Sequence, residues 1–114
     1  MAADVVMRTF GGMTIHNLTK LNIGVFVDAL LIDEHVILEH ENEAGANVHY
    51  IQVRHRSEGD YQLEYRAGSP AEHYQTHTDS RAKVVDALFA WSKGEVAWRD
   101  EFAWKSIGDW FTEQ

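Results

Sequence analysis

The alternating segment Tyr61–Arg66 and the turn signal after it constrain the fold more than any other stretch of this chain. Odd positions of this segment are apolar or aromatic (Tyr61, Leu63, Tyr65) and even positions are polar (Gln62, Glu64, Arg66). A period of two predicts a β-strand with one face on a core and the other face in water. Gly68-Ser69-Pro70, which contains the only proline, predicts a turn directly afterwards. The chain therefore needs a sheet that is covered on one side.

Similar patterns predict the partner strands of this sheet. Residues 5–10 and 13–16 flank Gly11-Gly12, and paired glycines suit the positive φ angles of a tight hairpin. Residues 34–41 are β-branched in the middle and charged at the ends, 48–55 predicts a further strand, and 73–77 returns after the proline turn. Short turns join 48–55 to 61–66, so we expect these two strands to pair in antiparallel fashion.

Two stretches have helical periodicity instead. The first spans residues 18–32, where Asn17 or Thr19 can cap the helix and Gly24 weakens it. The second follows Thr78-Asp79-Ser80 and ends at Gly94; it carries its apolar residues on one side, namely Val84, Val85, Leu88, Phe89 and Trp91.

The sequence therefore predicts one α+β domain over residues 1–114. We expect an antiparallel sheet of about five to six strands with two main helices packed on one side. Residues 96–111 are rich in tryptophan and predict a tail of short helical turns over the sheet.

Charge and composition narrow the classes of partner. The net charge is −8, and the ten lysines and arginines are scattered along the chain, so we expect no nucleic-acid binding. An acidic surface suits a basic protein, although solubility alone also explains it.

The chain lacks a basic leader followed by an apolar run and any apolar run of membrane-spanning length, which predicts a cytoplasmic protein that does not enter membranes. Cysteine is absent, so neither disulfides nor a thiolate nucleophile can form.

The seven histidines do not form a metal-binding pattern. His73 and His77 share a face of their predicted strand but lie roughly 13 Å apart there. His35 and His40 point to opposite faces, and His49 and His55 are too distant from each other. Ser69 lacks the flanking glycines of a hydrolase nucleophile. We expect no metal, no cofactor and no catalytic residues.

The tail combines large rings with negative charge. Trp91, Trp98, Trp104 and Trp110 are large amphipathic residues that occur both in cores and at the centres of interfaces. Acidic residues surround them, namely Glu95, Asp100, Glu101, Asp109 and Glu113. The two sets predict either core packing or an anionic aromatic patch.

The second half of the chain resembles a known family. The strand end EYR, the turn AGSP, the following HY, the helix KVVDALFAWSKGE and the closing WRDEFAW are similar to the actinobacterial immunity-protein family of polymorphic toxin systems. The resemblance implies a small α+β protein that binds and blocks a cognate secreted toxin. The matching positions shape the fold or touch the toxin; they are Glu64, Arg66, Ser69, Pro70, His73, Tyr74 and Trp91.

We therefore predict stoichiometric occlusion of a basic toxin by an acidic surface with aromatic residues at its centre. That surface would combine exposed strand residues with the tail; its candidate members are Glu64, Arg66, His73, Tyr74, Trp98, Asp100, Glu101 and Trp104.

Two alternatives stay open. The first is a non-enzymatic interaction or regulatory module, in which a homodimer would form through a sheet edge or the tryptophan-rich tail. The second is a small-molecule binder or enzyme with a pocket between sheet and helices, lined by several of His16, His49, Tyr65, His73 and Tyr74.

Overall fold

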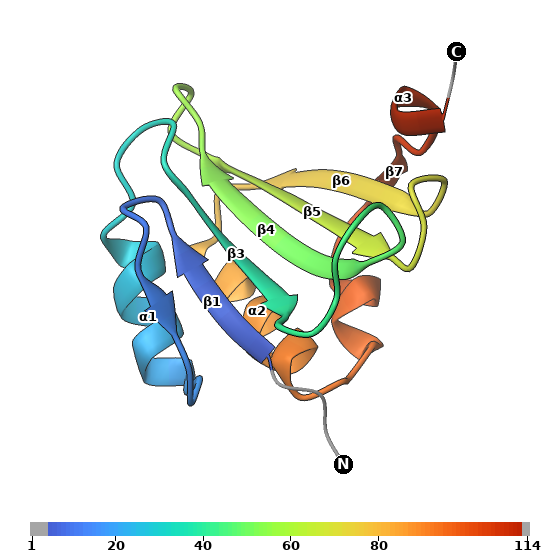
Figure 1. Cartoon of the computed structure of the whole chain (residues 1–114). Helices are drawn as coiled ribbons and strands as arrows, with labels where there is room; N and C mark the ends of the chain where they lie inside the picture. Colours follow the sequence, from blue (N-terminus) through green and yellow to red (C-terminus); the bar gives the residue numbers. More distant parts are fainter. Residues whose placement is uncertain (1–4, 113–114) are drawn as a thin grey trace.

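The computed structural model describes residues 5–112, which form an antiparallel sheet with helices packed on one face (Figure 1). The strand order is β2-β1-β3-β4-β5-β6-β7. The strands are β1 (Val5–Thr9), β2 (Thr14–Ile15), β3 (His35–His40), β4 (His49–His55), β5 (Tyr61–Ala67), β6 (His73–Thr78) and β7 (Lys105–Ser106). The α+β prediction is confirmed, and each expected strand is present. The seventh, β7, lies in the tail.

The two main helices lie on the same side of the sheet, as predicted. They are α1 (Lys20–Asp28) and α2 (Arg81–Ser92), followed by the 3-10 segment η1 (Ala97–Glu101). In Figure 1 these three elements lie below the sheet. Ser80 caps α2 by accepting a hydrogen bond from the Lys83 amide, and Gly94 takes a φ of +79° after the helix. Both ends of α2 therefore match the sequence signals.

Helix α1 is shorter than the predicted 18–32. It begins after Thr19, whose hydroxyl accepts from the Asn22 amide while the Asn22 side chain accepts from the Thr19 amide. It ends at Asp28, and the Leu30 amide bonds to the Val27 carbonyl in a tightened last turn. Asp33 then takes a φ of +72°, and its amide donates to the His55 carbonyl. The apolar run Leu30–Ile32 continued the helical pattern, but the chain turns there so that β3, from His35 onward, can pair with β4.

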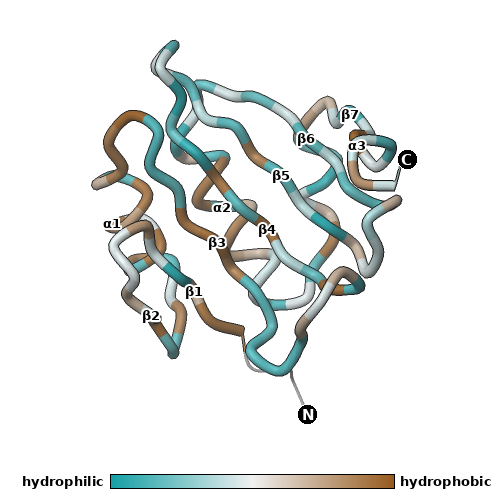
Figure 2. Tube along the Cα trace, turned by 45° about the horizontal axis from the view of Figure 1, so that its top comes forward, coloured by the Kyte–Doolittle hydropathy of each residue, from teal (hydrophilic) through white to brown (hydrophobic). Residues whose placement is uncertain are grey.

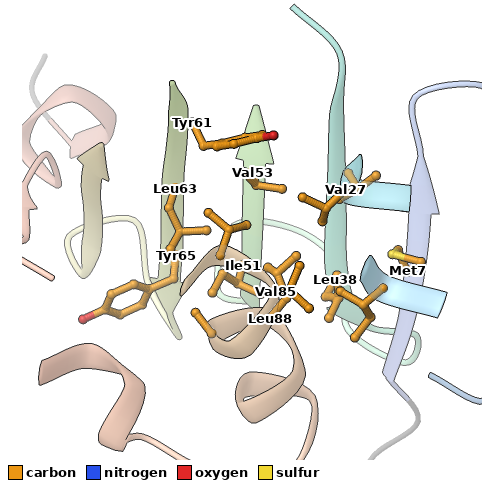
Figure 3. Packing of buried hydrophobic residues seen from close by; sticks show 14 of the residues in the cluster. Met7, Val27, Leu38, Ile51, Val53, Tyr61, Leu63, Tyr65, Val85 and Leu88 are labelled. Atoms are coloured by element: carbon orange, nitrogen blue, oxygen red, sulfur yellow. The ribbon is translucent and has the colours of Figure 1, made fainter. Parts of the chain in front are cut away.

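The core lies between the sheet and the two main helices. Leu38, Ile51 and Leu63 come from adjacent central strands and are fully buried against Leu88 and its neighbours in α2 (Figure 3). Ile23 and Val27 of α1 close the same cluster. Each fully buried aliphatic side chain contributes about 1.5–3 kcal/mol relative to exposure.

Strand register decides which side chains face the helices. Leu63 lies opposite Val53 and Thr76, and Tyr65 lies opposite Tyr74, so these side chains share the helix side. Arg66 lies opposite Tyr50 and His73, on the face without helices. The helix-free face is therefore polar over β4, β5 and β6, as the alternation of Tyr61–Arg66 predicts.

The tail contains the predicted short helical turns, and it also contains a strand that was not predicted. After η1, β7 pairs with β6 through Tyr74–Ser106 and Gln75–Lys105, and the Ile107 amide donates to the His73 carbonyl. The short helix α3 (Asp109–Thr112) then lies beyond this edge, on the opposite side of the sheet from α2 (Figure 1). The unpaired edge of β6 takes up this segment because its main-chain groups need partners. None of the helices within residues 5–112 has the length and apolar character needed to cross a membrane.

Replacement of Gly24 by alanine is expected to stabilise the protein. Glycine in a helix interior costs about 0.5–1 kcal/mol relative to alanine. A methyl group at this position would meet only Val85 Cγ1, at an ordinary contact distance of 3.9 Å. Gly24→Ala should raise the free energy of unfolding by about that amount, measured by urea denaturation. A loss of stability would show that α1 requires glycine at this point.

Candidate functional site

The helix-free face holds a connected group of polar side chains, which we call the sheet network: Tyr50, Glu64, Arg66 and His73. Arg66 Nε donates to His73 Nδ1 at 3.1 Å, and His73 Nε2 lies 2.9 Å from Glu64 Oε1. Arg66 also donates from Nη1 to the Ala46 carbonyl at 3.1 Å. The second Glu64 oxygen accepts from the side chains of Gln62 and Gln75. Glu64, Arg66 and His73 therefore each have hydrogen-bond partners within this group or on the backbone beside it.

The hydrogen bonds define the protonation state of His73. Because Nδ1 accepts from the Arg66 guanidinium, Nε2 carries the proton and donates it to Glu64. His73 is fully buried, and this desolvation lowers the pKa of its imidazole below the usual 6.5. The bond to Glu64 opposes this shift, and the positive charge of Arg66 adds to it. His73 is therefore neutral at pH 7 and joins two groups of opposite charge.

Two aromatic rings enclose the network. The Arg66 guanidinium lies 4.8 Å from the Phe111 ring centroid and 5.6 Å from that of Tyr50. Phe111 also lies 4.3 Å from the His73 ring. Burial raises the pKa of the Tyr50 phenol, and Arg66 opposes this shift. Phe111 belongs to α3, so the network holds the end of the tail on this face.

A second aromatic cluster lies on the opposite, helix side of the sheet. Tyr65 contacts Tyr74, Trp98 and Trp104 at centroid distances of 5.0, 5.0 and 4.7 Å. The indole N–H groups of Trp98 and Trp104 donate to the carbonyls of Glu95 and Arg99. These rings therefore fix the shape of η1 and the chain around it.

The structure divides the predicted binding surface between these two faces. Glu64, Arg66 and His73 lie in the sheet network, and Tyr74, Trp98 and Trp104 lie on the helix side. Glu64 and Arg66 were expected to be exposed, but Glu64 is partly buried and Arg66 is only 9% exposed. Strand register caused this division because Arg66 and Tyr65 are neighbours that point in opposite directions. Whether any of these residues binds a partner stays a prediction.

Two of the predicted binding residues are on open surface. Asp100 and Glu101 are exposed at the end of η1, and Glu95 is exposed before it. Glu113, the last acidic residue predicted to flank the rings, lies outside the described residues. Glu101 also lines a hollow of about 260 Å³ between α2 and η1, whose wall is mostly apolar but includes charged side chains; its other lining residues are Lys83, Asp86, Ala87, Ala90, Ala97, Trp98 and Phe102. We call this surface the acidic ridge, defined by Glu95, Asp100, Glu101 and this hollow.

The residues proposed for a small-molecule pocket are dispersed. Tyr65 and Tyr74 pack on the helix side, and His73 lies across the sheet from them. His16 and His49 line two different surface hollows. Ser69 lies in the turn and donates to Glu72. Within residues 5–112 there is no group of three histidine, aspartate or glutamate side chains placed to hold a metal ion.

The chain was compared with protein families, curated proteins and solved structures, and none of them matches it. The resemblance to immunity proteins therefore stays a proposal.

Sequence reasoning missed Tyr50 of the sheet network and Phe111, the ring that covers it. Tyr50 is at an even position of 48–55, which places it on the polar face, and this alternation was the signal available. Phe111 had no comparable signal, because its contact with Arg66 depends on the tail passing the β6 edge.

Replacement of His73 should remove part of the acid sensitivity of folding. The folded-state pKa lies below 6.5, so as pH falls below about 6.5 the unfolded chain takes up a proton that the folded protein does not. The free energy of unfolding therefore falls with pH, by at most about 1.4 kcal/mol per pH unit for one proton. His73→Gln replaces the imidazole donor and acceptor with an amide N–H and an amide oxygen, and the amide does not titrate. Urea denaturation from pH 7.5 to 5 should show that the free energy of unfolding depends less steeply on pH for His73→Gln than for the wild type. Equal pH dependence would contradict a lowered pKa of His73 in the folded protein.

Gly108 should be required for the tail to stay on the β6 edge. A Cβ atom at Gly108 would lie 2.0 Å from the Ala71 carbonyl oxygen and 2.6 Å from its carbon, which are backbone atoms. Gly108→Ala should therefore release residues 105–112 and increase hydrogen exchange at the Ile107 amide by about ten-fold or more. Gly11→Ala is the control, because no atom lies within 4 Å of its added methyl group. Unchanged exchange in Gly108→Ala would show that this segment docks in another way.

Proposed function

We propose that this protein is a non-catalytic immunity protein that binds a basic toxin stoichiometrically and covers its active site. The proposal rests on the family resemblance and on one structural observation: the acidic ridge places exposed carboxylates beside an apolar hollow. A toxin that acts on nucleic acid needs cationic groups in its cleft, and such groups are complementary to these carboxylates.

The chemistry of the acidic ridge suits an inhibitor. Exposed carboxylates raise the association rate with a basic partner, and an apolar centre slows dissociation. Phe102 is half-buried in the hollow, and Lys83 Nζ lies 4.8 Å from its ring centroid. The Phe102 ring can therefore hold a cation, and an arginine or lysine of the toxin would bind there by taking the place of Lys83.

The sheet network has a supporting part in this proposal. The ring nitrogens of His73 are both used by Arg66 and Glu64, and Phe111 covers the imidazole. These bonds fix β5 and β6, on whose other face Tyr65 stacks on Tyr74 and contacts Trp98 and Trp104. We therefore assign Glu64, Arg66 and His73 to positioning, and Asp100 and Glu101 to toxin contact.

The test is co-expression with the product of the neighbouring gene, followed by pull-down on this chain. We expect growth rescue and a stoichiometric complex. Asp100→Lys/Glu101→Lys should weaken the complex by about ten-fold or more, and added salt should weaken the wild-type complex. Glu41→Lys/Glu58→Lys is the matched control, because it makes the same charge change at exposed positions of the β3–β4 and β4–β5 turns.

Each outcome bears on a different part of the proposal. Absence of toxicity and of any partner would contradict the immunity function. A complex weakened equally by both double variants would contradict the acidic ridge as the binding site, because overall charge would then explain the effect.

A further inference from the structure

Helix α1 is apolar on all sides, although the protein covers only one of them. Between Lys20 and Asp28 its only polar side chain is Asn22. Ile23 and Val27 are buried in the core, whereas Leu21 is 79% and Val25 is 56% exposed. A helix with apolar residues all round is normally enclosed by protein. The outer side of α1 therefore has the composition of a contact surface.

The exposed side of α1 forms one wall of a groove against α2. Leu21, Gly24 and Val25 face Ala82 and Val85 across a groove of about 790 Å³. Six of the nine large hydrophobic residues that are exposed within residues 5–112 belong to this half of the fold: Phe10, Met13, Leu21, Val25, Leu31 and Ile32. In Figure 2 the segment that leaves α1 toward β3 is brown, which marks its residues as hydrophobic. Exposed apolar patches mark interaction sites, and Leu21 and Val25 form such a patch in this groove.

The charges around this groove indicate which kind of partner it suits. Lys20 pairs with Asp86 at 2.6 Å, and Asp28 pairs with Arg81 at 2.5 Å. The rim therefore carries two positive and two negative charges, in a chain whose net charge is −8. A basic partner finds no excess of negative charge here. Two copies of this chain repel each other over most of their surface, and this neutral rim is a place where the repulsion is weak.

We infer that the groove binds a second copy of this chain, with the two α1 helices antiparallel about a two-fold axis. Helix α1 is positive at its first residue and negative at its last. In an antiparallel contact, Lys20 therefore lies opposite Asp28 of the second copy, and Asp28 lies opposite its Lys20. Leu21 and Val25, one turn apart, pack between these ion pairs. A two-fold contact uses the same patch twice, so the patch must be complementary to itself, and this one is.

The dimer is expected to be weak. Nine residues of α1 span about 13 Å, which places the contact at the small end of specific interfaces. A dissociation constant of about 1–100 μM fits such a contact. Sedimentation equilibrium from about 1 μM to 1 mM should show the mass rising from 13.0 kDa to twice that value. A mass of 13.0 kDa over the whole range would overturn the inference.

Val25→Gln should weaken the dimer by about ten-fold or more, because it places an amide in the apolar centre. Val96→Gln is the matched control, since Val96 is the same residue type at 60% exposure outside the groove. Glutamine is a better helix former than valine, so loss of folding is not expected at position 25. Equal effects of the two variants would also overturn the inference.

A charge exchange tests the antiparallel arrangement. Lys20→Asp puts aspartate at both ends of α1, and Asp28→Lys puts lysine at both ends, so each variant alone should be monomeric. An equimolar mixture restores opposite charges at both ends and should dimerise with about the wild-type constant. The four side chains are more than half exposed, so loss of the internal pairs costs little. Failure of the mixture to associate would overturn the antiparallel contact.

This dimer does not depend on the immunity function. The acidic ridge and the α1 groove share only Asp86 among their lining residues. Asp100→Lys/Glu101→Lys should therefore leave the sedimentation behaviour unchanged, and Val25→Gln should leave toxin binding unchanged.

Discussion

The register between β5 and β6 is the constraint on which the rest of this structure depends. It sets Tyr65 opposite Tyr74 on the helix side and Arg66 opposite His73 on the other side. The first pair supports the indoles of Trp98 and Trp104, and the second pair builds the sheet network. A shift of one residue would send an arginine and a histidine into the apolar core. Because that shift would be so costly, the register is firmly specified.

The buried charge of Arg66 explains why the chain passes around the sheet edge. An arginine that is only 9% exposed needs partners for the donors and the charge of its guanidinium. Glu64 is linked to Arg66 only through the neutral ring of His73, and the Ala46 carbonyl supplies another acceptor. Phe111 then covers what the strands leave open. The bonds of β7 to the β6 edge bring Phe111 to this place, so sheet pairing and charge burial depend on each other.

Two surfaces with different chemistry result from this arrangement. The acidic ridge combines exposed carboxylates with aromatic residues, which suits a basic partner. The α1 groove is apolar, and its rim has balanced charges, which suits a second copy. The sequence suggested a homodimer through a sheet edge or the tryptophan-rich tail. In the structure Trp98 is buried and β7 covers part of the β6 edge, whereas Leu21 and Val25 of α1 are exposed beside each other in one groove.

Local chemistry in the sequence determined the α+β class, the order of strands and helices along the chain, and the alternation of faces in β5. It did so because period-two alternation, helix caps and turn glycines act over a few neighbouring residues. The end of α1, the strand character of Lys105–Ser106 and the place of Phe111 were decided only by tertiary structure, because each depends on pairing with a distant segment. Tertiary structure also decided the predicted binding surface. The sequence placed Arg66 and Trp98 on one surface, but in the structure they lie on opposite faces of the sheet.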